Sequence, residues 1–178
     1  MENIVKVLES GSNEEKIKIL KTLDKTDNPE VLEKIISKLD DDDIKVRGEA
    51  FSSLVLNKNK ISNFLIKNLD SPSKNIRGFA ALALANRNET DAIPNITKLA
   101  KDERSMVRSC AIGALGYLKA KGEKEIILDS VLDTNVEVRK SALHAIINLK
   151  FSISEERIKE MSKDADSELL KMLSKLKK

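Results

Sequence analysis

The sequence lacks most of the side chains from which catalytic and metal sites are built. Its 178 residues include one His, one Cys and no Trp. A single His excludes metal sites that need several His ligands, and a lone Cys cannot form a disulfide within the chain. Cys110 has no His at a matching periodicity to activate it, so we interpret it as a small packed residue. Neither a P-loop nor a GxGxxG motif occurs, and we expect no catalytic residue, no metal ligand and no cofactor.

Aromatic side chains are also scarce, with one Tyr and four Phe in the whole chain. A domain of this length has enough residues to bury a sizeable core, and such a core usually relies on aromatic area. Leu, Ile, Val and Ala must fill the core instead, as they do where helices pack closely. This composition favours an all-α protein.

Neither sign of charge dominates, and long apolar runs are missing. The chain has 32 Lys and Arg against 29 Asp and Glu, and a net charge of +3 is too small to imply nucleic acid or an anionic membrane as partner. The longest apolar run, Phe79 to Ala85, is far shorter than the about 20 residues that a membrane-spanning helix needs. The start, MENIVKVLES, lacks the basic and apolar regions of a secretory signal, so we expect a cytoplasmic protein.

An internal repeat runs along the chain and is marked by arginines spaced 30, 31 and 31 residues apart. The repeated stretches are DIKVRGEAFSSL, SKNIRGFAALAL, RSMVRSCAIGAL and NVEVRKSALHAI, and their arginines are Arg47, Arg77, Arg108 and Arg139. Apolar or small residues recur three, four and seven positions after each arginine. The columns are Ala50, Ala80, Ala111 and Ala142; Phe51, Ala81, Ile112 and Leu143; and Leu54, Leu84, Leu115 and Ile146. These offsets trace one face of a helix and predict that this face is buried.

The apolar columns continue in register at both ends, where Lys16 and Leu169 stand in place of the arginine. A shorter apolar-periodic stretch, such as PEVLEKIISKL, precedes each predicted helix and is joined to it by a polar turn. The turns supply N-cap and acidic side chains for the positive end of the next helix. Each unit is therefore a helical hairpin. We expect one domain over 1–178, with approximate repeats at 1–25, 26–57, 58–88, 89–120, 121–150 and 151–178.

The stretch AIPNITKLAKDERSMVRSCAIGALGYL has a proline in its first helix, an acid in the turn, Val-Arg at the start of its second helix, and then Ala and Ala-Leu. With these features the chain resembles the HEAT-repeat family, particularly the short HEAT-like repeats also found in phycobilisome lyases. The resemblance covers essentially the whole chain. It implies a right-handed α-solenoid of about six hairpins, with first helices on the convex side and second helices on the concave side. Lyase activity does not follow from the repeats alone, because a fold does not imply a function.

The arginine column has two interpretations. Regularly spaced arginines are typical of a stripe that binds phosphates. In the resembled family, however, this arginine packs against the turn and pairs with a nearby acid. The candidate acids here are Asp40 to Asp43, Asp70, Asp102 and Asp133. We favour the second interpretation, in which the four arginines form a structural ladder along the repeats, because the planar guanidinium group of Arg binds several acceptors at once.

The remaining positions of the second helices are almost free of charge. Among the twenty positions at offsets one, two, five, eight and nine from the four arginines, only Glu49 and Lys140 are charged, although 34% of the chain is charged. An uncharged patch of this kind usually marks a partner surface. The predicted apolar anchors are Val55, Phe79, Leu82, Tyr117 and Ile147, and the predicted polar residues are Glu49, Ser52, Lys140 and His144. The alternative for the small residues, glycine and alanine above all, is packing between neighbouring second helices.

The favoured hypothesis is a non-enzymatic scaffold or adaptor that binds a protein or peptide through its concave face. Nucleic-acid binding through Lys and Arg at helix edges is the first alternative. The second is an accessory subunit of a lyase or of another modifying enzyme. We expect a monomer or a weak homodimer that does not enter a membrane.

Overall fold

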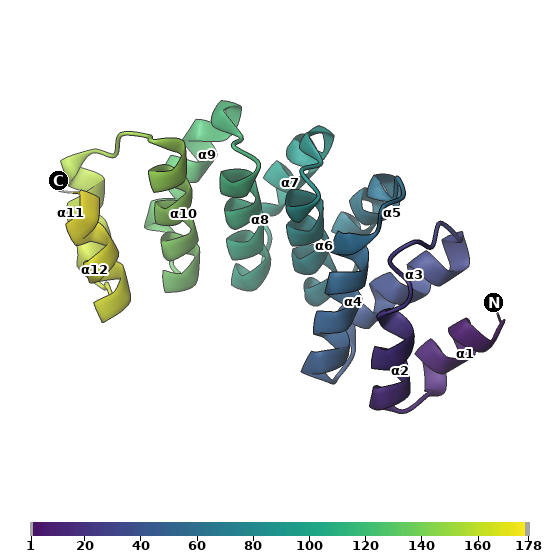
Figure 1. Ribbon diagram of the computed structural model, residues 1–178. Coiled ribbons are helices and arrows are strands. Elements are labelled where there is room, and N and C mark those ends of the chain that lie inside the picture. The colour runs from purple at the N-terminus through teal and green to yellow at the C-terminus, as the bar shows by residue number, and fades with distance from the viewer. Residues whose placement is uncertain (1, 177–178) are drawn as a thin grey trace. The chain divides into compact units, whose positions relative to one another are not determined.

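The computed structural model describes residues 2–176 of the chain. These residues form twelve α-helices and five short 3-10 helices without any strand, which confirms the prediction of an all-α fold (Figure 1). The described chain falls into two compact units, one that ends at Ala92 and one that begins at Ile93.

The first unit contains three pairs of helices. Its α-helices are α1 (Glu2–Ser10), α2 (Asn13–Leu20), α3 (Pro29–Ser37), α4 (Ile44–Leu56), α5 (Ser62–Lys67) and α6 (Lys74–Asn86), and its 3-10 helices are η1 (Lys38–Asp40), η2 (Asn68–Asp70) and η3 (Thr90–Ala92). The second helices α2, α4 and α6 pack side by side, and α1, α3 and α5 form a second layer (Figure 1).

The second unit repeats this arrangement. Its α-helices are α7 (Ile93–Leu99), α8 (Ser105–Tyr117), α9 (Lys124–Asp129), α10 (Val136–Leu149), α11 (Glu155–Ser162) and α12 (Ser167–Leu176), and its 3-10 helices are η4 (Lys121–Glu123) and η5 (Ser130–Leu132). The second helices α8, α10 and α12 pack in sequence. Two α-helices therefore fall within each of the six ranges expected for the repeats, while a single domain over the whole chain stays a prediction.

Polar turn residues start the second helices as the sequence predicts. The side chains of Asp43, Ser73 and Asn135 each accept a hydrogen bond from a backbone N–H in the first turn of the following helix. Helix α3 begins with Pro29 behind the N-cap Asn28, where the missing N–H of proline costs nothing. These caps fix where the second helices begin, and hence which side chains share a face.

Small and apolar columns fill the core of both units. The alanines three positions after each arginine are fully buried, as are the apolar residues seven positions after it: Ala50, Ala80, Ala111, Ala142, Leu54, Leu84, Leu115 and Ile146. The column four positions after the arginine has one exception. Phe51 is half-exposed, whereas Ala81, Ile112 and Leu143 are fully buried.

Candidate binding surface on the second helices

The five predicted partner residues of the first unit lie on α4 and α6. Glu49, Ser52, Val55, Phe79 and Leu82 are all half-buried, so each presents part of its side chain to solvent. None of the five is sealed into the core between the helix layers. This placement leaves the predicted surface of the first unit accessible.

The predicted residues of the second unit differ more from one another. Tyr117 at the end of α8 is 59% exposed, and Ile147 on α10 is 39% exposed. His144 is also exposed. These three side chains lie at the solvent-facing edge of α8 and α10, and they carry little charge.

Lys140 requires a correction, because its ammonium group is not available to guide a partner. The side chain is buried, and Nζ lies 3.0 Å from Glu137, 2.8 Å from Asp166 and 2.6 Å from Glu168. Hydrogen bonds that Lys140 donates to Asp166, Glu168 and Glu137 raise the pKa of this lysine above its usual range. This lysine ties α10 to the turn before α12 and to the start of that helix.

The small residues divide between packing and open surface. A Cβ atom added to Gly116 would lie 2.7 Å from Cβ and 2.9 Å from Cα of Ala145, so this glycine allows α8 to approach α10. A Cβ atom added to Gly48 or Gly113 would meet nothing within 4 Å. Gly116 therefore serves the packing between neighbouring second helices, whereas Gly48 and Gly113 face open space.

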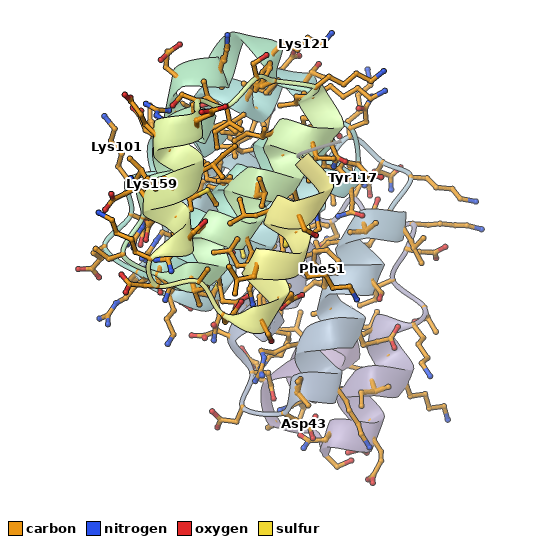
Figure 2. All side chains as sticks on the ribbon, turned by 90° about the vertical axis from the view of Figure 1, so that its left-hand side faces the viewer. Asp43, Phe51, Lys101, Tyr117, Lys121 and Lys159 are labelled. Atoms are coloured by element: carbon orange, nitrogen blue, oxygen red, sulfur yellow. The ribbon has the colours of Figure 1, made fainter. Side chains whose placement is uncertain are left out.

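An apolar hollow lies between α4 and α6. It has a volume of about 320 Å³ and is lined by Ile44, Arg47, Gly48, Phe51, Phe79 and Leu82. The rings of Phe51 and Phe79 are 6.2 Å apart between centroids and tilted by 59°, a geometry that aromatic pairs favour. Phe51 projects from α4 in the side-chain view of Figure 2. The two rings hold the hollow open by occupying positions where smaller residues would let the helices close.

The repeat pattern does not predict that two residues of this hollow, Ile44 and Phe51, line an exposed surface. Ile44 precedes the first arginine by three positions and is 72% exposed, although it is a large apolar residue at the start of α4. Phe51 belongs to a column that is otherwise buried. The signal for Phe51 is its size, since the much smaller Ala81 stands at the same position of α6.

The four arginines make one repeated contact with the turn before their helix. In each case Nη1 donates to the backbone carbonyls six and five residues earlier. The acceptors are Asp41 and Asp42 for Arg47, Ser71 and Pro72 for Arg77, Asp102 and Glu103 for Arg108, and Asp133 and Thr134 for Arg139. These bonds fasten each second helix to its own turn through main-chain oxygens.

Arg108 adds a carboxylate from the next repeat. Its Nε and Nη2 each lie 2.8 Å from an oxygen of Asp133, which forms a bidentate pair. Burial alone would raise the pKa of Asp133, but the hydrogen bonds from Arg108 and from the Asn135 amide lower it below its usual value. The guanidinium group of Arg108 is thereby fully committed.

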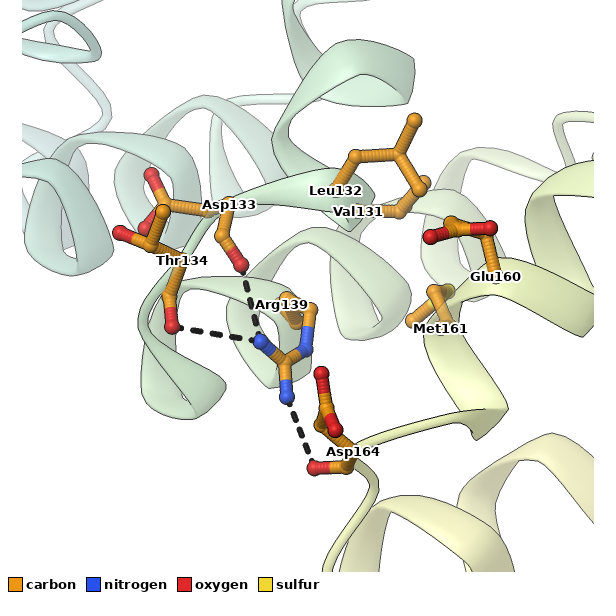
Figure 3. A pocket seen from close by; sticks show the side chains of 8 residues that line it. All are labelled: Val131, Leu132, Asp133, Thr134, Arg139, Glu160, Met161 and Asp164. Atoms are coloured by element: carbon orange, nitrogen blue, oxygen red, sulfur yellow. Dashed lines mark hydrogen bonds between the residues drawn. The ribbon is translucent and has the colours of Figure 1, made fainter.

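Arg139 lines a polar pocket of about 310 Å³ in the second unit (Figure 3). Its Nη2 donates to the backbone carbonyl of Asp164 at 3.0 Å, in addition to the two bonds from Nη1. Asp133, Glu160 and Asp164 also line the pocket, so its walls carry more negative than positive charge. The pocket therefore does not suit a phosphate or another anion.

A family model for HEAT repeats matches residues 62–147. This stretch of the chain contains HEAT repeats. The match covers the end of the first unit and most of the second, and it confirms the resemblance to this family. No curated protein matches the sequence.

Solved structures give the same fold for nearly the whole chain. A chain of the complex of CpcE and CpcF of phycocyanin lyase from Nostoc sp. PCC7120 is similar with a TM-score of 0.70 and 18% identity, over 85% of this chain and 100% of that chain. A designed armadillo repeat protein in complex with the peptide (KR)4 has a TM-score of 0.53 and 20% identity, over 97% of this chain and 95% of that chain. At these identities the likeness establishes the α-solenoid fold alone.

The single cysteine, Cys110, lies on helix α8. Burial raises the pKa of the Cys110 thiol to about 11, so this thiol is protonated near neutral pH and is a poor nucleophile. Within the described residues, no cluster of three His, Cys, Asp or Glu side chains is placed to hold a metal ion. No helix in that part of the chain combines the length and apolar character needed to cross a membrane.

Proposed function

We propose that this HEAT-repeat protein is a non-enzymatic adaptor that binds a protein or peptide partner through the exposed faces of its second helices. The observation that carries the proposal is the apolar hollow between α4 and α6, with Phe51 and Phe79 in its wall. Concave apolar sites with a few polar groups are the usual places where proteins bind ligands. A continuous concave groove along all six repeats remains a prediction.

The size of the hollow suits one large apolar side chain. Burial of a Leu or Phe side chain there contributes about 1.5–3 kcal/mol, which is the contribution expected of an anchor residue in an interface. Tyr117 and Ile147 offer further exposed apolar area on the second helices of the second unit. The designed armadillo protein of the same fold is solved in complex with a peptide, which supports peptide binding as a use of this fold.

The test is selection of peptides from a random dodecapeptide library displayed on phage, with the full chain immobilised. We expect enrichment of peptides that contain Leu, Phe or another large apolar residue. In fluorescence anisotropy, Leu82→Lys and Phe79→Glu should weaken the selected peptides by about tenfold or more, because each places a charge in the apolar hollow.

The matched control is Leu132→Lys, which changes an apolar side chain that is 45% exposed and lies in the second unit. It should leave the affinity within about twofold, since surface substitutions away from a site have small effects. Circular dichroism of every variant should show the helical content of the original protein. Library selection without any enriched peptide, or equal binding by Leu82→Lys, would contradict the proposed function.

A role as an accessory subunit of a lyase is the second candidate. The similarity to a chain of a phycocyanin lyase complex, over the full length of that chain, favours it. This role requires a partner subunit or a conjugated ligand. Native mass spectrometry and absorbance of the protein purified from its own cells would reveal either one, and a mass equal to that of the bare chain would count against it.

A further inference from the structure

The cation at the start of a second helix pairs with a carboxylate from the turn of the next repeat. In the first unit, Nζ of Lys16 lies 3.0 Å from Asp41, and in the second unit Arg108 holds Asp133 through two bonds of 2.8 Å. Asp41 and Asp133 occupy the same place, six residues before the arginine of their own repeat. The repeat therefore contains a fixed site for a carboxylate beside the preceding cation.

Ser71 occupies this place in the repeat that follows Arg47. Its position in the turn is equivalent, because each of the three side chains accepts a hydrogen bond from the N–H two residues later. The pairs are Asp43 N to Asp41 Oδ1 at 3.2 Å, Ser73 N to Ser71 Oγ at 3.3 Å, and Asn135 N to Asp133 Oδ1 at 2.8 Å. The turn keeps its geometry at Ser71, but it offers no carboxylate to Arg47.

Arg47 is consequently left with half of its guanidinium group unpaired. Its Nη1 donates to the carbonyls of Asp41 at 2.7 Å and Asp42 at 3.1 Å. Among residues 2–176, Nε and Nη2 of Arg47 have no acceptor within hydrogen-bond distance, and no carboxylate forms an ion pair with this side chain. Nε and Nη2 are the atoms that hold Asp133 in the case of Arg108.

The unpaired arginine lines the same hollow as the two phenylalanines. Ile44, Phe51, Phe79 and Leu82 provide the apolar wall, and Arg47 provides the charged wall. Apolar surroundings strengthen an ion pair that forms beside them, because they lower the local dielectric constant. The hollow thus combines a space for an apolar side chain with a cation that lacks its counter-ion.

We propose that the occupant of this hollow is an acidic peptide segment of the partner, in which a large apolar residue lies close to an Asp or Glu. The apolar side chain packs on Phe51, Phe79 and Leu82. The carboxylate accepts hydrogen bonds from Nε and Nη2 of Arg47 and takes the place that Asp133 has beside Arg108. This inference rests on the proposed function and adds the chemistry of the partner.

The decisive variant is Ser71→Asp, which supplies the missing carboxylate from within the chain. It should pair with Arg47 and compete with the carboxylate of a peptide. The probes are the selected dodecapeptides and their counterparts with each Asp or Glu changed to Asn or Gln. Asn63→Asp is the matched control, because Asn63 is an exposed residue of the first helix α5 in the same unit and the change adds the same charge.

We expect the selected peptides to contain an acidic residue near a large apolar one. Ser71→Asp should lower their affinity by about tenfold, as expected for the loss of a charge-assisted bidentate pair, whereas Asn63→Asp should change it by less than about twofold. The amidated counterparts should bind both variants equally. A raised melting temperature of Ser71→Asp would show that the variant folds and that the new pair forms.

Two outcomes would overturn the inference and leave the proposed function standing. One is enrichment of apolar peptides without acidic residues that still lose affinity in Leu82→Lys. The other is an unchanged affinity of acidic peptides for Ser71→Asp. Selection without any enriched peptide would instead remove the proposed function itself.

Discussion

The helix pairs α4 with α6 and α8 with α10 each join the second helices of two consecutive repeats, yet one pair is open and the other closed. Between α8 and α10, Gly116 allows contact with the backbone of Ala145, and the hydroxyl groups of Ser109 and Ser141 are 2.9 Å apart. Between α4 and α6, Phe51 and Phe79 contact each other in the wall of a hollow. The size of a few side chains decides whether the repeat buries this face or leaves it exposed to solvent.

The two pairs also differ in how their arginines are neutralised. Arg108 binds the carboxylate of Asp133, whereas Arg47 faces a turn with Ser71 at the same place. In the closed pair, the two helices are in contact and the arginine has a carboxylate partner. In the open pair, the helices leave a hollow between them and the arginine has no carboxylate partner among the residues that the structure describes. This combination is expected of a surface that functions by binding.

The largest expected effect concerns the arginines. Arg108→Met should destabilise the protein by about 2–3 kcal/mol, because it removes two carbonyl contacts and leaves the part-buried Asp133 unpaired. Arg47→Met should cost only about 1 kcal/mol, since it removes carbonyl contacts alone. Urea denaturation followed by circular dichroism measures both values. Equal losses would show that the Asp133 pair contributes nothing to stability.

A smaller effect is expected from the glycines of α8. Gly116→Ala should destabilise the protein by about 1–2 kcal/mol, because the new methyl group would lie too close to Ala145 and force the helices apart. Gly113→Ala adds the same methyl group into open space and should stabilise the helix by about 0.5–1 kcal/mol. Thermal unfolding of the two variants compares them directly. Stabilisation by both would mean that α8 and α10 are not in close contact.

The repeated parts of the fold could be predicted from the sequence, because the same buried positions and the same helix caps recur in each repeat. Ala50, Ala80 and Ala111 recur at one offset because that position of each second helix faces the core, and all three are buried. The turn residues Asp43 and Ser73 could be recognised by their capping chemistry. Helix pairs, their order and their buried faces follow from these two signals.

The parts that escaped prediction depend on departures from the period. The sequence pattern predicts that Lys140 is a surface lysine without an ionic partner. Its partners Asp166 and Glu168 belong to the last repeat, where the pattern is weakest. The column predicts that Phe51 is buried, but Phe51 is half-exposed, whereas the smaller Ala81 at the same position of α6 is fully buried. Comparison of the column six residues before each arginine would have revealed Ser71 as the exception, but the resulting unpaired Arg47 becomes visible only with the hydrogen bonds in place.

The smallest expected effect is a dependence on pH that distinguishes the closed pair from the open one. The hydrogen bonds from Arg108 and the Asn135 amide outweigh burial and lower the pKa of Asp133, so its pairing stabilises the folded state above the unfolded pKa of about 3.9. This stabilisation is lost as the pH falls through the lower pKa of the folded state. Asp133→Asn should therefore reduce the melting temperature by about 3 °C at pH 7 and by clearly less near pH 3. Ser71→Asn, at the open pair, removes no carboxylate, and its difference from the original protein should stay the same from pH 7 to pH 3. A difference for Asp133→Asn that does not shrink in acid would mean that the carboxylate is not ionised in its bond to Arg108, and the contrast between the two arginines would then rest on packing alone.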